Sequence, residues 1–140
     1  MPSDPAAPAS PSPIALRIGS VYTVDDLVSW LRHSGLGDAA SVLHAAAERQ
    51  LVGFLTTDGQ WAFPEWSFER ADSHLTVREE VAELWRELPH DGFLTDSDLC
   101  AWMNTRLVGL DNMAPATYMS LHGIQSQVRS AVRRLNARVR

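Results

Sequence analysis

The stretch LVGFLTTDGQWAFPEWSF forms residues 51–68 and largely decides the fold. Two apolar runs, 51–56 and 60–63, flank Thr57-Asp58-Gly59, and an Asp-Gly pair between apolar runs is typical of a β-hairpin. Pro64 ends the second run because proline donates no hydrogen bond to a strand ladder. The stretch therefore predicts two antiparallel strands.

Four aromatic side chains lie close together in this stretch: Trp61, Phe63, Trp66 and Phe68. Trp61 and Phe63 alternate along one strand and so share a face. An aromatic face can stack nucleic-acid bases, but no basic residues are interleaved with this one. We expect the aromatic run to pack between the hairpin and the helical half of the chain.

Two short helices are expected before the hairpin. Thr23 caps the first, over residues 25–33, and Asp38 caps the second, which runs to about Arg49. Gly35 lies in the break between them, so the pair predicts a helix-turn-helix-like unit. With the hairpin, this unit is similar to a winged-helix or excisionase-like module. The inner face of the second helix is expected to consist of Val42, Leu43 and Ala46.

The chain after residue 70 is expected to be helical. Its first helix ends at Pro89, and a later short helix begins at Pro115 and ends at Gly123. Two capping boxes begin helices in this half: Thr76 with Glu79, and Thr95 with Asp98. The last helix is expected to bury the stripe Ile124, Val128, Ala131, Val132, Leu135 and Val139.

These elements predict a mostly α protein: a helix-turn-helix-like unit with a β-hairpin, followed by a small helical bundle. Residues 1–13 hold five of the eight prolines and are expected to be a disordered tail. Residues 14–70 form the helix-turn-helix-like unit with the hairpin, and residues 71–140 form the helical domain.

The sequence lacks the signatures of enzymes. It has no glycine-rich phosphate loop and no nucleophile elbow, and its five histidines do not fall at metal-ligand spacing. Cys100, the single cysteine, is expected to be a small buried residue beside Leu99 and Trp102. His90-Asp91-Gly92 is interpreted as a loop rather than an acid/base pair. We expect a binding protein with no catalytic residues, no cofactor and no metal.

Membrane and secretion signals are also absent from the sequence. No run approaches the roughly 18 apolar residues that cross a bilayer, and the N-terminus lacks the basic flank and apolar core of a secretory signal. A cytoplasmic location is expected.

The net charge of −5 is unevenly distributed. Residues 72–111 contain nine acidic residues and three arginines, whereas residues 112–140 contain five arginines and no acidic residue. This asymmetry is consistent either with a basic C-terminal arm that meets an acid-lined partner or with an ordinary solvated helix face.

The second expected helix occupies the recognition position of a helix-turn-helix. Its candidate DNA contacts are Ser41, His44 and Arg49. Acids outnumber arginines by seven to four between residues 14 and 70, which is a poor charge balance for binding phosphates. The unit is therefore either a weak operator-binding module or a module for dimerisation and packing.

Two segments resemble antitoxins of the Xre/MbcA/ParS type. The first is residues 51–68, and the second runs from Trp102-Met103-Asn104 to Leu110-Asp111, then Pro115, then Leu121-His122-Gly123. The resemblance covers about residues 39–140. It implies that the helical domain binds a cognate RES-domain toxin, which consumes NAD or transfers ADP-ribose. It further implies blocking of the toxin's active site, repression of the chain's own operon, and a homodimer or higher toxin–antitoxin complex.

Toxin contacts are predicted on the helical domain at Trp102, Arg106, Arg134, Arg138 and Arg140. Arginine is suited to pairing with carboxylates in a desolvated cleft. The alternative is a DNA-binding transcriptional regulator with a winged-helix-like unit and no toxin partner. A third hypothesis is an adaptor that dimerises through the aromatic hairpin.

Overall fold

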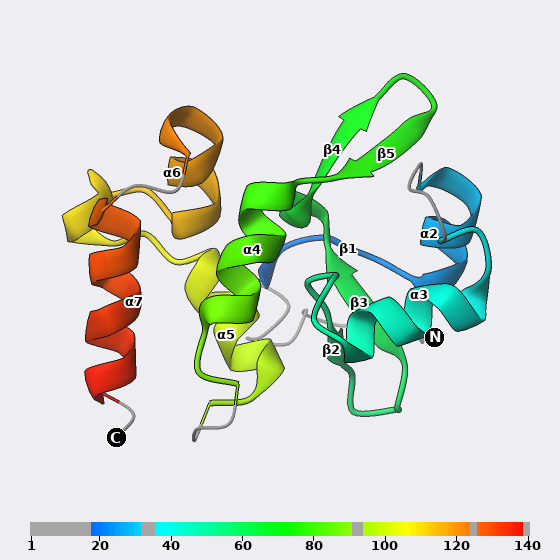
Figure 1. The fold of residues 1–140 in the computed structure, drawn as a ribbon, viewed down its shortest axis with the longest axis horizontal. Helices are drawn as coiled ribbons and strands as arrows, with labels where there is room; N and C mark the ends of the chain where they lie inside the picture. The colour runs from blue at the N-terminus through cyan, green and yellow to red at the C-terminus, as the bar shows by residue number, and fades with distance from the viewer. Residues whose placement is uncertain (1–17, 32–35, 91–93, 124–125, 139–140) are drawn as a thin grey trace, which may run out of the picture.

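A computed structural model describes residues 18–31, 36–90, 94–123 and 126–138 (Figure 1). Within these ranges the chain is mostly helical with short antiparallel strands, which confirms the predicted fold class. The helices are α2 (Val24–Trp30), α3 (Ala39–Ala47), α4 (Glu79–Glu87), α5 (Asp96–Met103), α6 (Pro115–His122) and α7 (Ser126–Arg138). The strands are β1 (Val21–Tyr22), β2 (Phe54–Leu55), β3 (Trp61–Pro64), β4 (Phe68–Ala71) and β5 (His74–Val77).

Three of the predicted helix caps are confirmed. Thr23 and Thr95 each form a capping box, with Asp26 and Asp98 respectively, and Asp38 accepts a hydrogen bond of 2.8 Å from the backbone of Ser41. The predicted tail, 1–13, and Gly35 lie outside the described residues. The inner face of α3 is Val42, Ala45 and Ala46, whereas Leu43 is 40% exposed, so placing Leu43 inside was wrong. Positions 42, 45 and 46 lie on one side of a helix, and position 43 is rotated away from it.

The predicted hairpin is confirmed as β2 and β3, in which Phe54 lies opposite Ala62 and Leu55 opposite Trp61. β1 pairs with the other edge of β3, through Val21 with Pro64 and Tyr22 with Phe63, and no local pattern indicated this pairing. β3 is thus the central strand of a three-stranded antiparallel sheet.

The predicted capping box of Thr76 and Glu79 is wrong. Thr76 lies in β5, opposite Glu69 of β4, and α4 begins after Arg78 without a side-chain cap. Residues 68–77 form a second hairpin because Phe68 and Leu75 bury their side chains against the N-terminal helices. This tertiary burial overrides the local capping signal. The hairpin also spans the expected boundary at residue 70.

Two hydrophobic clusters lie on opposite sides of β3. The N-terminal cluster includes Phe63 with side chains of α2, α3 and β5, and the C-terminal cluster includes Ala62 with side chains of α4 to α7. Phe63 and Phe68 belong to the first cluster, whereas Trp66 packs against the second. The expectation that the aromatic run packs between the hairpin and the helical half is therefore wrong for Trp61, Phe63 and Phe68, which pack in the N-terminal cluster, and holds only for Trp66.

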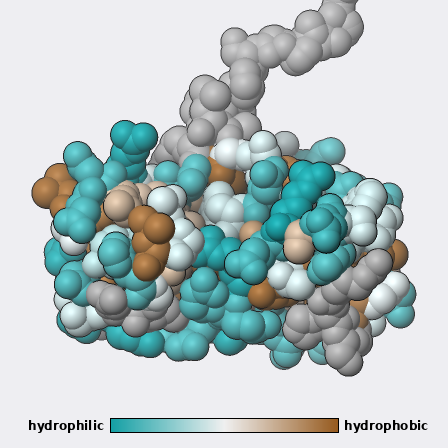
Figure 2. Space-filling model, turned by 90° about the horizontal axis from the view of Figure 1, so that it is seen from above, coloured by the Kyte–Doolittle hydropathy of each residue, from teal (hydrophilic) through white to brown (hydrophobic). Residues whose placement is uncertain are grey.

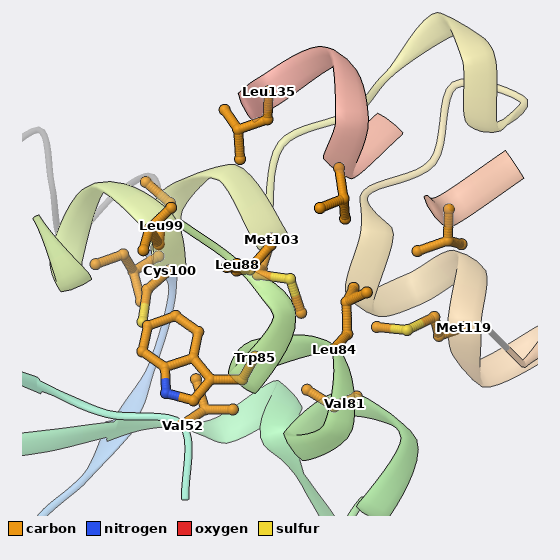
Figure 3. Close-up of a cluster of buried hydrophobic side chains, with 14 of the residues drawn as sticks. Val52, Val81, Leu84, Trp85, Leu88, Leu99, Cys100, Met103, Met119 and Leu135 are labelled. Carbon is orange, nitrogen blue, oxygen red and sulfur yellow. The ribbon is translucent and has the colours of Figure 1, made fainter. Parts of the chain in front are cut away.

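Trp85 of α4 lies at the centre of the C-terminal cluster, where Figure 3 shows its indole ring between Val52 and Cys100. Trp85 and Cys100 are both fully buried, which confirms the interpretation of Cys100 as a small core residue. None of the helices within the described ranges has the length and hydrophobicity needed to span a bilayer.

Gly53 precedes β2 where two strands pack closely. A Cβ at this position would lie 2.9 Å from Cδ1 of Phe63, which is itself fully buried. We therefore expect Gly53→Ala to lower the free energy of unfolding by about 1–3 kcal/mol, as overpacking does. The matched control is Gly37→Ala, since a Cβ at Gly37 meets nothing within 4 Å. Equal urea midpoints for the two variants would refute the close packing of β2 on β3.

Candidate protein-binding site

Helix α7 is held to the body of the molecule by one apolar face and one arginine. Its buried side chains are Val128, Ala131, Val132 and Leu135, as predicted, while Ile124 and Val139 lie outside the described residues. Arg129 donates hydrogen bonds to Glu87 and, at 3.4 Å, to Glu83 of α4. The hydrogen bond and charge of Glu87 raise the pKa of Arg129. Arg129 is therefore occupied within the chain and is a poor candidate for a partner contact.

The loop between α5 and α6 is closed on itself. The backbone N–H of Leu107 donates to Met113 O at 3.1 Å, and the N–H of Asn112 donates to Leu107 O at 3.0 Å. Asp111 and Asn112 both adopt left-handed backbone conformations, with φ of 55° and 63°. Such conformations are uncommon outside glycine, although Asp and Asn tolerate them better than most residues. The tight closure gives residues 107–113, here called the knob loop, a defined shape.

The knob loop buries one apolar side chain and exposes another. Leu110 is fully buried in the C-terminal cluster and anchors the short 3₁₀ helix η2 (Val108–Leu110). Val108 is 90% exposed, more than the other exposed large hydrophobic side chains of the described residues. Figure 2 shows hydrophobic surface, in brown, at the end of the molecule where α6 and α7 lie. An apolar side chain held this far into solvent at a molecular end is available to a partner.

Arg134 of α7 lies directly over the knob loop. A Cβ on Gly109 would come within 2.8 Å of Nη2 of Arg134, so glycine allows the guanidinium to sit close to the backbone. A hollow of about 220 Å³ opens here. Its lining residues are Trp102, Leu107, Val108, Gly109, Ala131, Arg134 and Leu135. The structure thus brings Trp102 and Arg134, two predicted toxin contacts from different helices, to one hollow.

The other predicted toxin contacts are less well defined. Arg106 is exposed and immediately precedes Leu107, which lines the hollow. Arg138 is the last residue of α7, but its side chain lies outside the described part of the chain, as does the whole of Arg140. Sequence reasoning missed Val108 and Gly109, because neither a single valine nor a single glycine signals a binding surface.

The predicted DNA contacts do not form one exposed surface. Ser41 and His44 line a cleft of about 560 Å³ between α3 and α4, together with Arg86. Arg49 points elsewhere, and its Nη1 lies 3.0 Å from both carboxylate oxygens of Asp96 at the start of α5. The charge of Arg49 is therefore neutralised within the chain.

Asp96 joins Arg49 to a third residue, His90. Nδ1 of His90 lies 3.1 Å from Oδ1 of Asp96, and Nε2 of His90 contacts the carbonyl oxygen of Trp85. The His90 ring also packs edge-on against Trp85, with ring centroids 4.5 Å apart. This network ties the end of α3, the end of α4 and the start of α5 together. Asp91 and Gly92, which follow His90, lie outside the described residues.

The electrostatics of this network favour the ionised form of Asp96. Burial raises the pKa of Asp96, but hydrogen bonds from His90 and Arg49 outweigh it and leave the pKa below its usual value. Burial, together with the negative charge of Asp96, raises the pKa of the Cys100 thiol well above its usual value. A buried, protonated thiol is a poor nucleophile. Within the described ranges, no three His, Cys, Asp or Glu side chains are grouped so that they could hold a metal ion.

We expect Asp96→Asn to lower the free energy of unfolding by about 1–2 kcal/mol at neutral pH, because a charge-assisted hydrogen-bond network is weakened. A carboxylate whose pKa is lowered in the folded state stabilises that state fully at pH values above its unfolded pKa of about 3.9. This stabilisation is lost as the pH falls through the folded-state pKa. The difference between the variant and the unmodified protein should therefore shrink in acid. Thermal unfolding between pH 7 and pH 3 measures it, with Asp25→Asn on the surface as control. A difference independent of pH would contradict the ionic network.

Comparisons with protein-family models, with curated proteins and with solved structures find no match to this chain. The resemblance to Xre/MbcA/ParS antitoxins therefore remains a prediction.

Proposed function

We propose that this chain is an antitoxin that binds a cognate RES-type toxin through the face formed by the knob loop and α7, and so occludes the toxin's active site. The observation that carries the proposal is the meeting of Trp102 and Arg134 at one hollow beside Val108. The toxin class comes from the resemblance of residues 51–68 and 102–123 to the antitoxin family. Autorepression of the operon and assembly of a higher toxin–antitoxin complex belong to the same proposal.

The apolar part of this face suits a protein partner. Val108 projects into solvent, and the hollow beside it has apolar walls from Leu107, Ala131 and Leu135. Protein interfaces concentrate their affinity in a few such central apolar contacts with a polar rim. A free amino acid or nucleotide would not need a projecting valine, whereas a partner protein with an apolar recess would cover it.

The charge of this face suits an acid-lined partner. Residues 112–140 hold five arginines and no acid, and only Arg129 among them is paired with carboxylates of α4 in the described structure. Within the described part of the chain, Arg133 hydrogen-bonds Ser130, at 2.9 Å, and Arg134 is exposed. Arginine pairs with carboxylates in two-pronged geometry, and such pairs gain strength when water is excluded. An enzyme cleft that carries catalytic carboxylates would meet this requirement.

Operator binding without a toxin has weaker support. The helix-turn-helix-like unit α2–α3 with its hairpin is the feature that favours it. Of its three candidate contacts, Arg49 is bound to Asp96, while Ser41 and His44 supply no permanent positive charge. Tight binding to DNA needs several cations that neutralise phosphates.

The proposal is tested by co-expressing the chain with the product of the neighbouring open reading frame. The full chain should co-purify with that product and restore growth. Val108→Asp and Arg134→Glu should each weaken the complex by at least about tenfold, as expected for central interface residues. Leu55→Ser is the matched control, since Leu55 is 56% exposed on β2 and is not among the residues that line the hollow.

A further variant in the same experiment ends after Leu135 and lacks Arg138 and Arg140. It should fail to restore growth if the C-terminal arginines take part in occlusion. Normal binding by both Val108→Asp and Arg134→Glu would overturn the proposed face. Absence of any complex with the full chain would overturn the antitoxin function itself.

A further inference from the structure

The cleft between α3 and α4 has no part in the proposed toxin-binding face. Its volume of about 560 Å³ is more than twice that of the hollow beside Val108. Small-molecule sites typically occupy clefts of about 300–1,000 Å³. Ser41 and His44, which were selected as candidate DNA contacts, line this concave surface. A concave site of this size suits a small organic ligand better than it suits a DNA backbone.

The floor of the cleft is apolar and lies where the two hydrophobic clusters meet. Leu36, Ala45 and Leu51 line the cleft and belong to the N-terminal cluster, whereas the buried side chains of α4 belong to the C-terminal cluster. Val77, the last residue of β5, completes the apolar part of the lining. Ligand sites are common at such junctions between packed units. All four apolar side chains are aliphatic, so they offer a surface on which a hydrocarbon chain can pack.

Polar side chains that donate hydrogen bonds stand around this apolar floor. Arg86 of α4, His44 of α3 and Gln50 all line the cleft and are exposed. Within the described ranges, the only hydrogen bond of Arg86 is a long one of 3.5 Å, from its Nη1 to the carbonyl oxygen of Arg49. A guanidinium group carries five N–H donors, so most of those of Arg86 remain for an anion.

The charges of the cleft favour a ligand with a single negative group. Glu79 and Arg86 both line it and are seven residues apart on α4, which places them on one stripe of the helix about 10 Å apart along its axis. The carboxylate of Glu79 repels a second anionic group, which disfavours nucleotides and other polyanions. One carboxylate at Arg86, with an apolar body over Ala45 and Leu51, matches both the charge and the shape of the lining.

We propose that this cleft binds a small aliphatic monocarboxylate. The carboxylate pairs with the guanidinium of Arg86, His44 and Gln50 supply further hydrogen-bond donors, and the hydrocarbon chain covers the apolar floor. Arginine and carboxylate form two parallel hydrogen bonds, and such pairs gain strength when water is displaced. The bound ligand joins α3 to α4, whose labels in Figure 1 mark the two walls of the cleft. This inference does not depend on the proposed function.

The test is a titration of the isotope-labelled full chain with octanoate, followed through the chemical shifts of its backbone amides. We expect saturable shifts within residues 36–51 and 77–86, with a dissociation constant below about 1 mM. Octanamide has the same hydrocarbon chain without the charge, so it should bind at least about tenfold more weakly. Equal affinities for octanoate and octanamide, or no saturable shifts in these residues, would overturn the inference.

A first pair of variants tests the cation. Arg86→Gln removes the charge that holds the carboxylate, and it should raise the dissociation constant for octanoate by at least about tenfold. Arg70→Gln is the matched control, because Arg70 is an exposed arginine on β4 that does not line the cleft. An affinity that Arg86→Gln leaves unchanged would show that the carboxylate is not bound where we propose.

A second pair of variants tests the space without altering any charge. Ala40→Leu fills part of the cleft from an exposed position of α3 and should also weaken the binding of octanoate. Ala39→Leu is its control, since Ala39 is exposed on the same helix but does not line the cleft. Leucine is a good helix former, so both variants should keep α3. Equal binding of octanoate by the two leucine variants would place the ligand outside this cleft and overturn the inference.

Discussion

The alternation of side chains along β3 organises the whole molecule. Phe63 points to the N-terminal cluster and Ala62 to the C-terminal cluster, because successive residues of a strand face opposite sides. The same strand pairs with β1 on one edge and β2 on the other. Two small hydrophobic clusters, each with little area to bury, are thereby joined into one body. The close approach of Gly53 to Phe63 shows how little space remains at this junction.

Polar contacts then fix the helices around this strand. The carboxylate of Asp96 joins Arg49 and His90, and Arg78 donates hydrogen bonds to carbonyl oxygens of Trp66 and Ala116 at 2.8 and 3.1 Å. Arg129 attaches α7 to the acidic surface of α4. Three arginines of a chain without lysine are thus used inside the fold. Arg134 lies over Gly109 and remains at the surface. Arg49, Arg78 and Arg129 therefore hold the fold together, whereas Arg134 is a candidate for binding a partner.

Local signals in the sequence predicted the features that depend on neighbouring residues. The caps at Thr23, Asp38 and Thr95 and the Asp58-Gly59 turn were found because each acts within a few positions. Features that depend on distant residues were missed. β1 pairs with β3, which lies some forty residues further along the chain. Thr76 belongs to strand β5, although its position three residues before Glu79 is typical of a helix cap.

The candidate binding face was likewise only partly predictable. Trp102 and Arg134 were selected from helix pattern and charge, and the structure places them at one hollow. The exposure of Val108 results from the closed loop of residues 107–113, and no local sequence pattern predicts the shape of this loop. Arg49 was selected for its charge, but its pairing with Asp96 spans 47 positions and could not be foreseen.

The most direct test of the proposed face is amide hydrogen exchange of the full chain, with and without the product of the neighbouring open reading frame. Backbone amides covered by a partner exchange more slowly, so the footprint is located without any substitution. We expect new protection in the knob loop and along α7, and none in α3. Protection centred on α3, or none anywhere in a complex that forms, would contradict binding through this face.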